Sequence, residues 1–86
     1  MEHPSRREGV RHKLKIKPSY FAALKRGEKT CEIRLNDRDY RVGDVLDFAP
    51  IRDDGTYTGE VATYGVSHVL KDFEGLAEGY VALSLR

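Results

Sequence analysis

The segment VRHKLKIK, from Val10 to Lys17, alternates without interruption between apolar and basic positions. Successive side chains of a β-strand point to opposite faces, so this period of two predicts a half-buried strand. The side predicted to be buried carries Val10, His12, Leu14 and Ile16. The side predicted to face water is a row of cations made by Arg11, Lys13, Lys15 and Lys17.

A short helix is predicted over PSYFAALKRG, directly after this strand. Pro18 suits the first helical position, and Gly27 suits the position just past the last turn. The expected apolar stripe consists of Tyr20, Phe21 and Leu24. The pattern therefore places one helix directly after the first predicted strand and before residue 29.

Four further strands are predicted over residues 29–35, 45–50, 58–70 and 80–85, separated by polar turns. In the second strand, alternation predicts that Cys31, Ile33 and Leu35 face the core. The opposite face would then carry Thr30, Glu32 and Arg34. About five strands and one helix in so short a chain predict an α+β, mostly β fold, a small curled sheet or barrel with the helix packed on it.

The chain has 86 residues, which is enough for one domain, expected over residues 10–86. Residues 1–9 are expected to form a disordered, basic tail, or a remnant of a wrongly assigned start, and they lack the apolar segment of a secretory signal. No apolar run approaches the ~20 residues of a membrane span. Cys31 is the only cysteine, which excludes an intrachain disulfide and favours a cytoplasmic location.

Basic residues are concentrated in the first 26 residues, whose formal charge is +6, although the whole chain carries only +1. Such asymmetry favours a polyanionic partner, but a requirement for solubility explains it equally well.

The segment GEKTCEIR places Lys29, Glu32 and Arg34 close together. Glu32 and Arg34 lie roughly 7 Å apart on one strand face. They form either an exposed ion pair or part of a cleft beside the end of the helix.

Residues 27–34 fit the pattern G-x-K-x-x-E-x-R, which resembles the signature of ASCH domains, members of the PUA-like superfamily. Further segments resemble one branch, the DUF3850 family: HKLKI, P-x-YF, NDR-x-Y-x-VGD and GYV-x-L. The resemblance spans roughly residues 11–85. It implies a small PUA-like β-barrel with the helix covering one opening. It also implies a cleft beside that helix, with RNA or a nucleotide-like molecule as ligand.

By this resemblance, Lys29, Glu32 and Arg34 would line the cleft, with Asn36 and Arg38 at its rim. Lysine and arginine side chains can hold phosphate oxygens, arginine often with two parallel hydrogen bonds. A carboxylate can orient an arginine or accept from a base amino group. The remaining residues predicted to contribute are Tyr20 or Tyr40 as a stacking surface, His12, and the cations Lys13, Lys15 and Lys17. A core position is the more usual role for Tyr20, and a strand-end position is as good an account of His12.

An alternative function is hydrolysis of a modified nucleoside, because some ASCH-fold proteins cleave an acyl group from a modified cytidine. In those proteins a lysine at the position of Lys29 works with a threonine where this chain has Glu32. Lys29 and Glu32 would be the catalytic pair here, with Thr30 displaced by two residues. A small protein-interaction module is a further alternative. No metal site or cofactor is expected, a monomer is assumed, and the residues leave open RNA, DNA or a mononucleotide as ligand.

Overall fold

The computed structural model describes residues 9–86. Along the chain it forms β1 (Arg11–Ile16), α1 (Pro18–Lys25), β2 (Cys31–Leu35), β3 (Val45–Pro50), β4 (Ala62–Leu70) and β5 (Tyr80–Leu85). The expected mostly β fold with one helix after the first strand is therefore confirmed. Apart from Gly9, the expected tail lies outside the described residues. Within residues 9–86, no helix has the length and apolar character that a membrane crossing requires.

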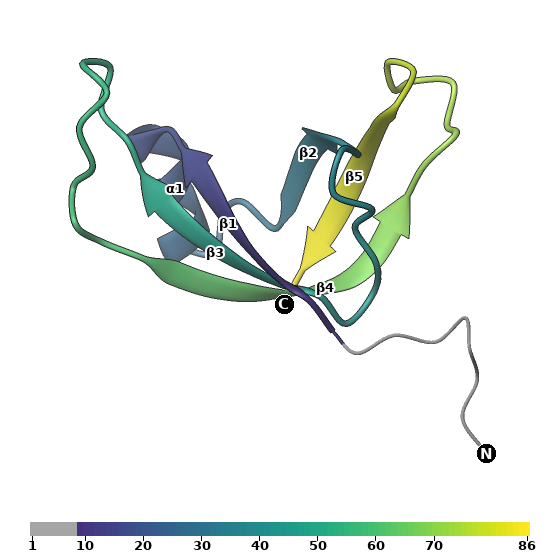
Figure 1. Ribbon diagram of the computed structural model, residues 1–86, viewed down its shortest axis with the longest axis horizontal. Coiled ribbons are helices and arrows are strands. Elements are labelled where there is room, and N and C mark those ends of the chain that lie inside the picture. Colours follow the sequence, from purple (N-terminus) through teal and green to yellow (C-terminus); the bar gives the residue numbers. More distant parts are fainter. Residues whose placement is uncertain (1–8) are drawn as a thin grey trace.

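The strands form one curled sheet in the order β1-β3-β4-β5-β2. β1 and β3 are parallel, whereas the other neighbouring pairs are antiparallel. β4 belongs to both halves, because residues 62–65 pair with β3 and residues 66–70 pair with β5. The register shifts between Val66 and His68, where the strand bends. Figure 1 shows the result: two arms diverge from β4, one made by β1, β3 and α1 and the other by β2 and β5.

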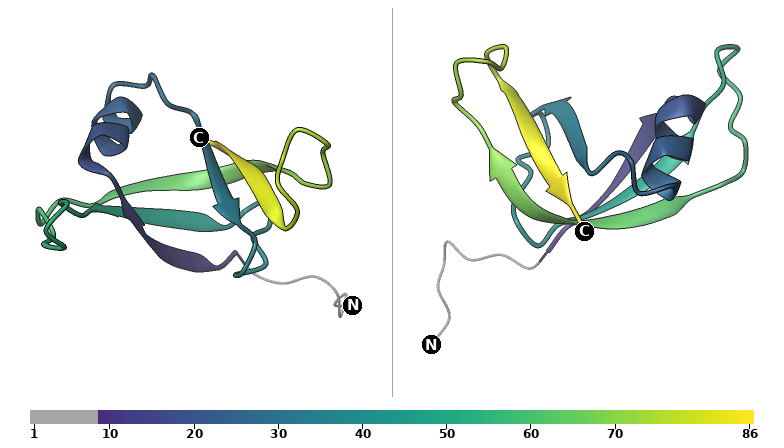
Figure 2. Two further views of the ribbon diagram at one scale, coloured as in Figure 1. Left: turned by 90° about the horizontal axis from the view of Figure 1, so that it is seen from above. Right: turned by 180° about the vertical axis from the view of Figure 1, so that it is seen from behind.

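The core lies on the inner side of these arms. β1 alternates between exposed and buried residues as predicted, and β3 buries Leu46 and Phe48 completely. From α1, Phe21 and Leu24 reach the core, and the helix packs against β3. Gly27 follows the helix with a φ of 76°, a left-handed conformation that favours glycine and turns the chain towards β2. Figure 2 shows α1 beside the β1–β3 arm from two further directions.

The predicted orientation of the second strand is wrong. In β2, Glu32 is buried with 6% of its surface exposed, whereas Ile33 is 57% exposed. Cys31 and Leu35 are also exposed. Alternation was correctly expected, but the charged side chains occupy the inner face because Glu32 finds cationic partners there. The prediction that Tyr20 joins the apolar stripe is likewise wrong, since this side chain is 51% exposed.

The sheet does not close into a barrel through a backbone ladder among the described residues. β1 and β2 are its two edge strands. Two arginine side chains from the β2 arm instead reach carbonyl oxygens of β1. Arg34 Nη2 donates to Lys15 O at 2.6 Å, and Arg38 Nη1 donates to Lys13 O at 3.0 Å. The fold is therefore a curled half-barrel whose open seam is bridged by side chains.

Candidate functional site

A cleft of about 450 Å³ lies along this seam, between β1, α1, β2 and the loop of residues 36–44. Its floor includes the core side chains Leu14 and Ile16. Its charged lining consists of the four cations Lys15, Lys17, Arg34 and Arg38 and the two carboxylates Glu32 and Asp37. Cations therefore exceed carboxylates by two, which favours an anionic ligand.

Glu32 holds two cations at one end of the cleft. Its Oε1 lies 3.0 Å from Lys29 Nζ, and its Oε2 accepts from Arg34 Nε at 2.7 Å. Lys29 also donates to the carbonyl of Cys31. Both oxygens of this buried carboxylate are thus paired, which satisfies the condition for burying a charge. The three residues of the G-x-K-x-x-E-x-R motif form one connected cluster.

Arg34 and Arg38 form a pair of bridges across the seam, since both reach carbonyls of β1. Arg34 is held at two points, by Glu32 and by Lys15, with its side chain only partly exposed. Ordering the guanidinium before a ligand arrives reduces the entropy lost on binding. The bridges therefore place two planar cations at fixed positions along the cleft.

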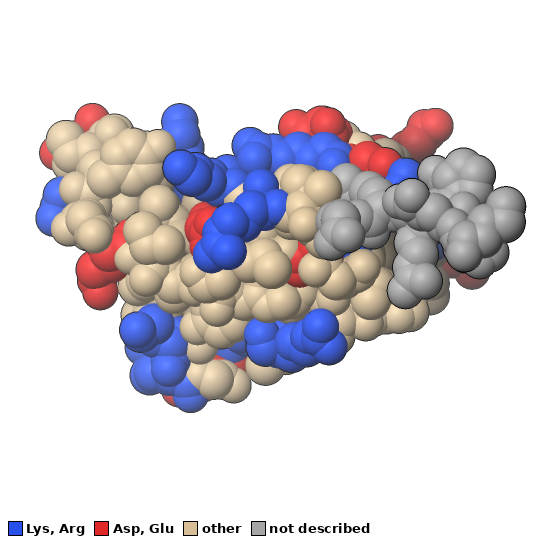
Figure 3. All heavy atoms as spheres, turned by 60° about the horizontal axis from the view of Figure 1, so that its bottom comes forward, with Lys and Arg blue, Asp and Glu red and all other residues tan. Residues whose placement is uncertain are grey.

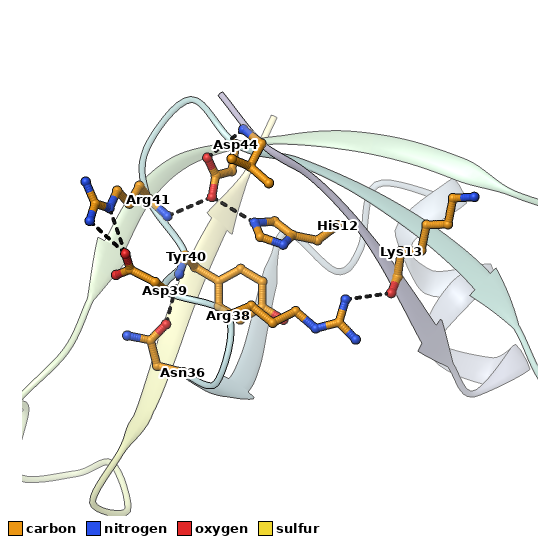
Figure 4. Close-up of polar contacts among 9 residues, drawn as sticks. His12, Lys13, Asn36, Arg38, Asp39, Tyr40, Arg41 and Asp44 are labelled. Carbon is orange, nitrogen blue, oxygen red and sulfur yellow. Dashed lines mark hydrogen bonds and ion pairs between the residues drawn. The ribbon is translucent and has the colours of Figure 1, made fainter. Parts of the chain in front are cut away.

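The loop of residues 36–44, which carries Arg38, is fixed by its own polar contacts (Figure 4). Asn36 Oδ1 accepts from the Tyr40 backbone N–H at 3.0 Å. Asp44 is buried and accepts from the backbone N–H groups of Val10 and Arg41. Its Oδ2 also lies 2.9 Å from His12 Nε2. These contacts tie the loop to β1.

The two tyrosines proposed as stacking surfaces have different surroundings. Tyr20 is exposed and lines the cleft, with Lys17 Nζ 5.6 Å and Lys29 Nζ 5.5 Å from its ring centroid. Tyr40 is only 4% exposed and packs edge-on against His12, with ring centroids 4.8 Å apart. Burial raises the pKa of the Tyr40 phenol, although Arg38 and Arg34 oppose the shift. Tyr20 is the tyrosine of the two whose face is available to a ligand.

The cationic row formed by β1 and the next residue, Lys17, is exposed as predicted, but its members differ in role. Lys15 and Lys17 line the cleft, and Lys13 lines a neighbouring hollow. Arg11 pairs with Asp47 at 2.8 Å, and this hydrogen bond holds the pKa of the Asp47 carboxyl below its usual value. Figure 3 shows basic side chains in separate groups on the face it displays, with uncharged and acidic surface between them.

The structure brings most of the predicted site residues together and leaves three aside, of which Lys13 lines the neighbouring hollow. Gathered in or beside the cleft are Lys29, Glu32, Arg34, Arg38, Tyr20, Lys15 and Lys17. Asn36 is used to fix the loop, and His12 is buried against Asp44. Sequence reasoning missed Asp37 and Tyr80, which also line the cleft. Tyr80 is adjacent to it because β5 pairs with β2, opposing Tyr80 to Leu35, a pairing that no local pattern reveals.

The side chains of the cleft suit the binding of an anion better than the binding of a metal ion. Among the described residues, no group of three or more His, Cys, Asp or Glu side chains could hold a metal ion. The ionisable groups of the cleft are its ammonium and guanidinium groups, the doubly paired carboxylate of Glu32, the carboxylate of Asp37 and three tyrosine phenols, of which those of Tyr20 and Tyr80 are exposed. Together these can hold phosphate oxygens and a planar ring.

The fold and this cluster define a small, mostly β protein with a cationic cleft at the seam of a half-barrel. The chain belongs to the family described as a domain of unknown function, DUF3850, whose model matches residues 11–85. This match confirms the resemblance to that family. A comparison with curated proteins finds no match to the chain.

Proposed function

We propose that this protein is an RNA- or nucleotide-binding module, whose ligand lies in the cleft between β1, α1 and β2. The observation that carries the proposal is the cluster in which Glu32 fixes Lys29 and Arg34 beside a cleft with an excess of cations. Arg34 supplies the central phosphate contact, and Lys29 supplies a second positive charge. Tyr20, exposed between two lysines, offers its ring to a base.

The roles of the other residues follow from their positions. Arg38 extends the phosphate-binding surface along the seam, and Lys15 and Lys17 add attraction that is independent of base sequence. Glu32 orients both cations. The motif resembles that of ASCH domains, and a half-barrel with one helix supports placing the chain within the PUA-like superfamily. A cytoplasmic location fits the single, exposed cysteine.

A second candidate function is the hydrolysis of a modified nucleoside at the same site. One observation favours it: Lys29 Nζ and Glu32 Oε1 lie 3.0 Å apart, within reach for proton transfer. Against it, Glu32 also binds Arg34, and no threonine occupies its position. Chromatography of acylated cytidine incubated with the protein separates the two functions, because a binding module releases no free cytidine.

The binding function is tested by fluorescence anisotropy with short, labelled single-stranded RNA and DNA at two salt concentrations. Binding that weakens with salt is expected. Replacing Arg34 with alanine should lower the affinity about tenfold or more, as removal of a hydrogen bond to a charged group does. Lys29→Ala should lower the affinity and reduce the salt slope by about 0.7, the value for one phosphate contact on a single strand.

Lys71→Ala is the matched control, because Lys71 is exposed and lies outside the cleft. It removes the same charge as Lys29→Ala and should change the affinity little. The proposal is contradicted if neither nucleic acid binds at low salt. It is also contradicted if the Lys29 and Lys71 variants lose affinity equally, since that result would mean a general effect of net charge.

A further inference from the structure

A second hollow shares part of its lining with the cleft, including the two bridging arginines. Its volume is also about 450 Å³, within the ~300–1,000 Å³ typical of small-molecule sites. Leu14, Lys15, Arg34 and Arg38 line both spaces. The two guanidinium groups that bridge the seam therefore form a wall shared by both.

The second hollow repeats the features that make the first a candidate site. Its charged lining consists of Lys13, Lys15, Arg34 and Arg38. It also has an aromatic side chain, Tyr57, which comes from the segment after β3 and is 52% exposed. Tyr20 occupies the corresponding role in the cleft, at 51% exposed. Each hollow thus combines at least one accessible aromatic ring with the same pair of arginines, and the cleft has a second such ring in Tyr80.

The spacing of the bridges suits an extended ligand. Arg34 and Arg38 contact the carbonyls of Lys15 and Lys13, which are two residues apart on one strand and therefore about 7 Å apart. The cations follow the edge of β1 and do not converge on one point. Proteins that bind single strands combine a cationic track of this kind with aromatic rings on which successive bases stack.

We infer that the two hollows are consecutive nucleotide subsites for a single-stranded oligonucleotide, an inference that rests on the proposed function. One base lies against Tyr20 and the next against Tyr57. The phosphodiester that joins the two nucleotides lies over Arg34 and Arg38. The ligand is then a strand of at least two nucleotides, and a mononucleotide fills only one subsite. The sugar can be ribose or deoxyribose, since both backbones present the same phosphodiester.

The test is a length series of adenine ligands, measured by isothermal titration calorimetry on the full chain: mononucleotide, dinucleotide and tetranucleotide, each with ribose and with deoxyribose. The dinucleotide should bind at least tenfold more tightly than the mononucleotide. The further gain in affinity from dinucleotide to tetranucleotide should be much smaller. Tyr57→Ala should weaken dinucleotide binding about tenfold, within the range of one lost base stack, and leave mononucleotide binding nearly unchanged.

Two matched variants accompany this test. Tyr57→Phe keeps the ring and should retain dinucleotide affinity, which separates loss of stacking from loss of folding. Phe73→Ala removes an exposed aromatic ring outside both hollows and should have no effect. Preference for one sugar series identifies RNA or DNA as the ligand.

Equal affinity for mononucleotide and dinucleotide would overturn the two-subsite inference and leave the proposed function intact. The two-subsite inference would also be overturned, with the proposed function intact, if Tyr57→Ala lowered the affinity for mononucleotide and dinucleotide equally or left both affinities unchanged. If no member of the series binds, the proposed function fails together with the inference.

Discussion

At the scale of single residues, Glu32 determines whether the candidate site exists at all. Its two oxygens hold Lys29 and Arg34, and Arg34 in turn reaches the edge of β1. A buried carboxylate is tolerated only when partners compensate the loss of water. The pairing that permits its burial is therefore the same pairing that positions two cations for a ligand.

Glu32→Gln should destabilise the protein by about 1–3 kcal/mol, because the neutral amide replaces two charge-assisted contacts with weaker ones. Urea unfolding at neutral pH measures the change. Glu28→Gln is the control, because Glu28 forms an exposed ion pair with Arg26 and its replacement should cost less than about 1 kcal/mol. Equal destabilisation by the two variants would mean that the Glu32 cluster is no stronger than a surface ion pair.

At the scale of secondary structure, β2 shows the limit of prediction from local pattern. The alternation of residues 29–35 correctly indicated a strand, and hydrophobicity then assigned Cys31, Ile33 and Leu35 to the core. The assignment failed because burial of Glu32 depends on Arg34 and Lys29, and on a facing strand edge that is distant in sequence. In β1, by contrast, the predicted faces are those observed.

Because the orientation of β2 is inverted, we expect substitutions of apolar residues on the paired strands β2 and β5 to destabilise the protein by very different amounts. Leu83→Ala should cost about 2–5 kcal/mol, because Leu83 of β5 is fully buried in the core. Ile33→Ser should cost no more than about 1 kcal/mol, because Ile33 is mostly exposed. Thermal and urea unfolding of the two variants would measure this difference. A larger loss for Ile33→Ser would restore the orientation that hydrophobicity alone predicts.

The stability of the protein at alkaline pH should depend on Tyr40, which lies in the loop of residues 36–44. Burial raises the pKa of its phenol above the ordinary value of 10.0. The folded state therefore keeps a proton that the unfolded chain loses. The stabilising contribution is complete below pH 10.0 and is lost as the pH rises through the folded-state pKa.

Tyr40→Phe should make the fall of unfolding free energy above pH 10 less steep, because phenylalanine has no proton to lose. Unfolding by urea at a series of pH values measures the slope, with Tyr57→Phe as an exposed control. Parallel slopes for wild type and Tyr40→Phe would contradict a buried phenol at this position.

At the scale of the whole molecule, the bend of β4 creates the site. It turns the sheet so that the two edge strands, β1 and β2, lie on arms that diverge from β4 (Figure 1) and share no ladder, and arginine side chains bridge the seam between them. The sequence could predict five strands, the helix between the first two, and the residues of the motif. It could not predict which strands are edges, and hence that Arg34 and Arg38 bridge them, because that depends on pairing between distant segments.

The proposed function requires that Arg34 and Arg38 at this seam contact the phosphates of a nucleic-acid ligand. Nuclear magnetic resonance of the arginine Nε–Hε groups, recorded while single-stranded oligonucleotide is added, tests it most directly. We expect the signals of Arg34 and Arg38 to shift and saturate together, while those of Arg26 and Arg86, which lie outside the cleft, remain in place. Unchanged signals from Arg34 and Arg38, or equal shifts at all four arginines, would contradict it.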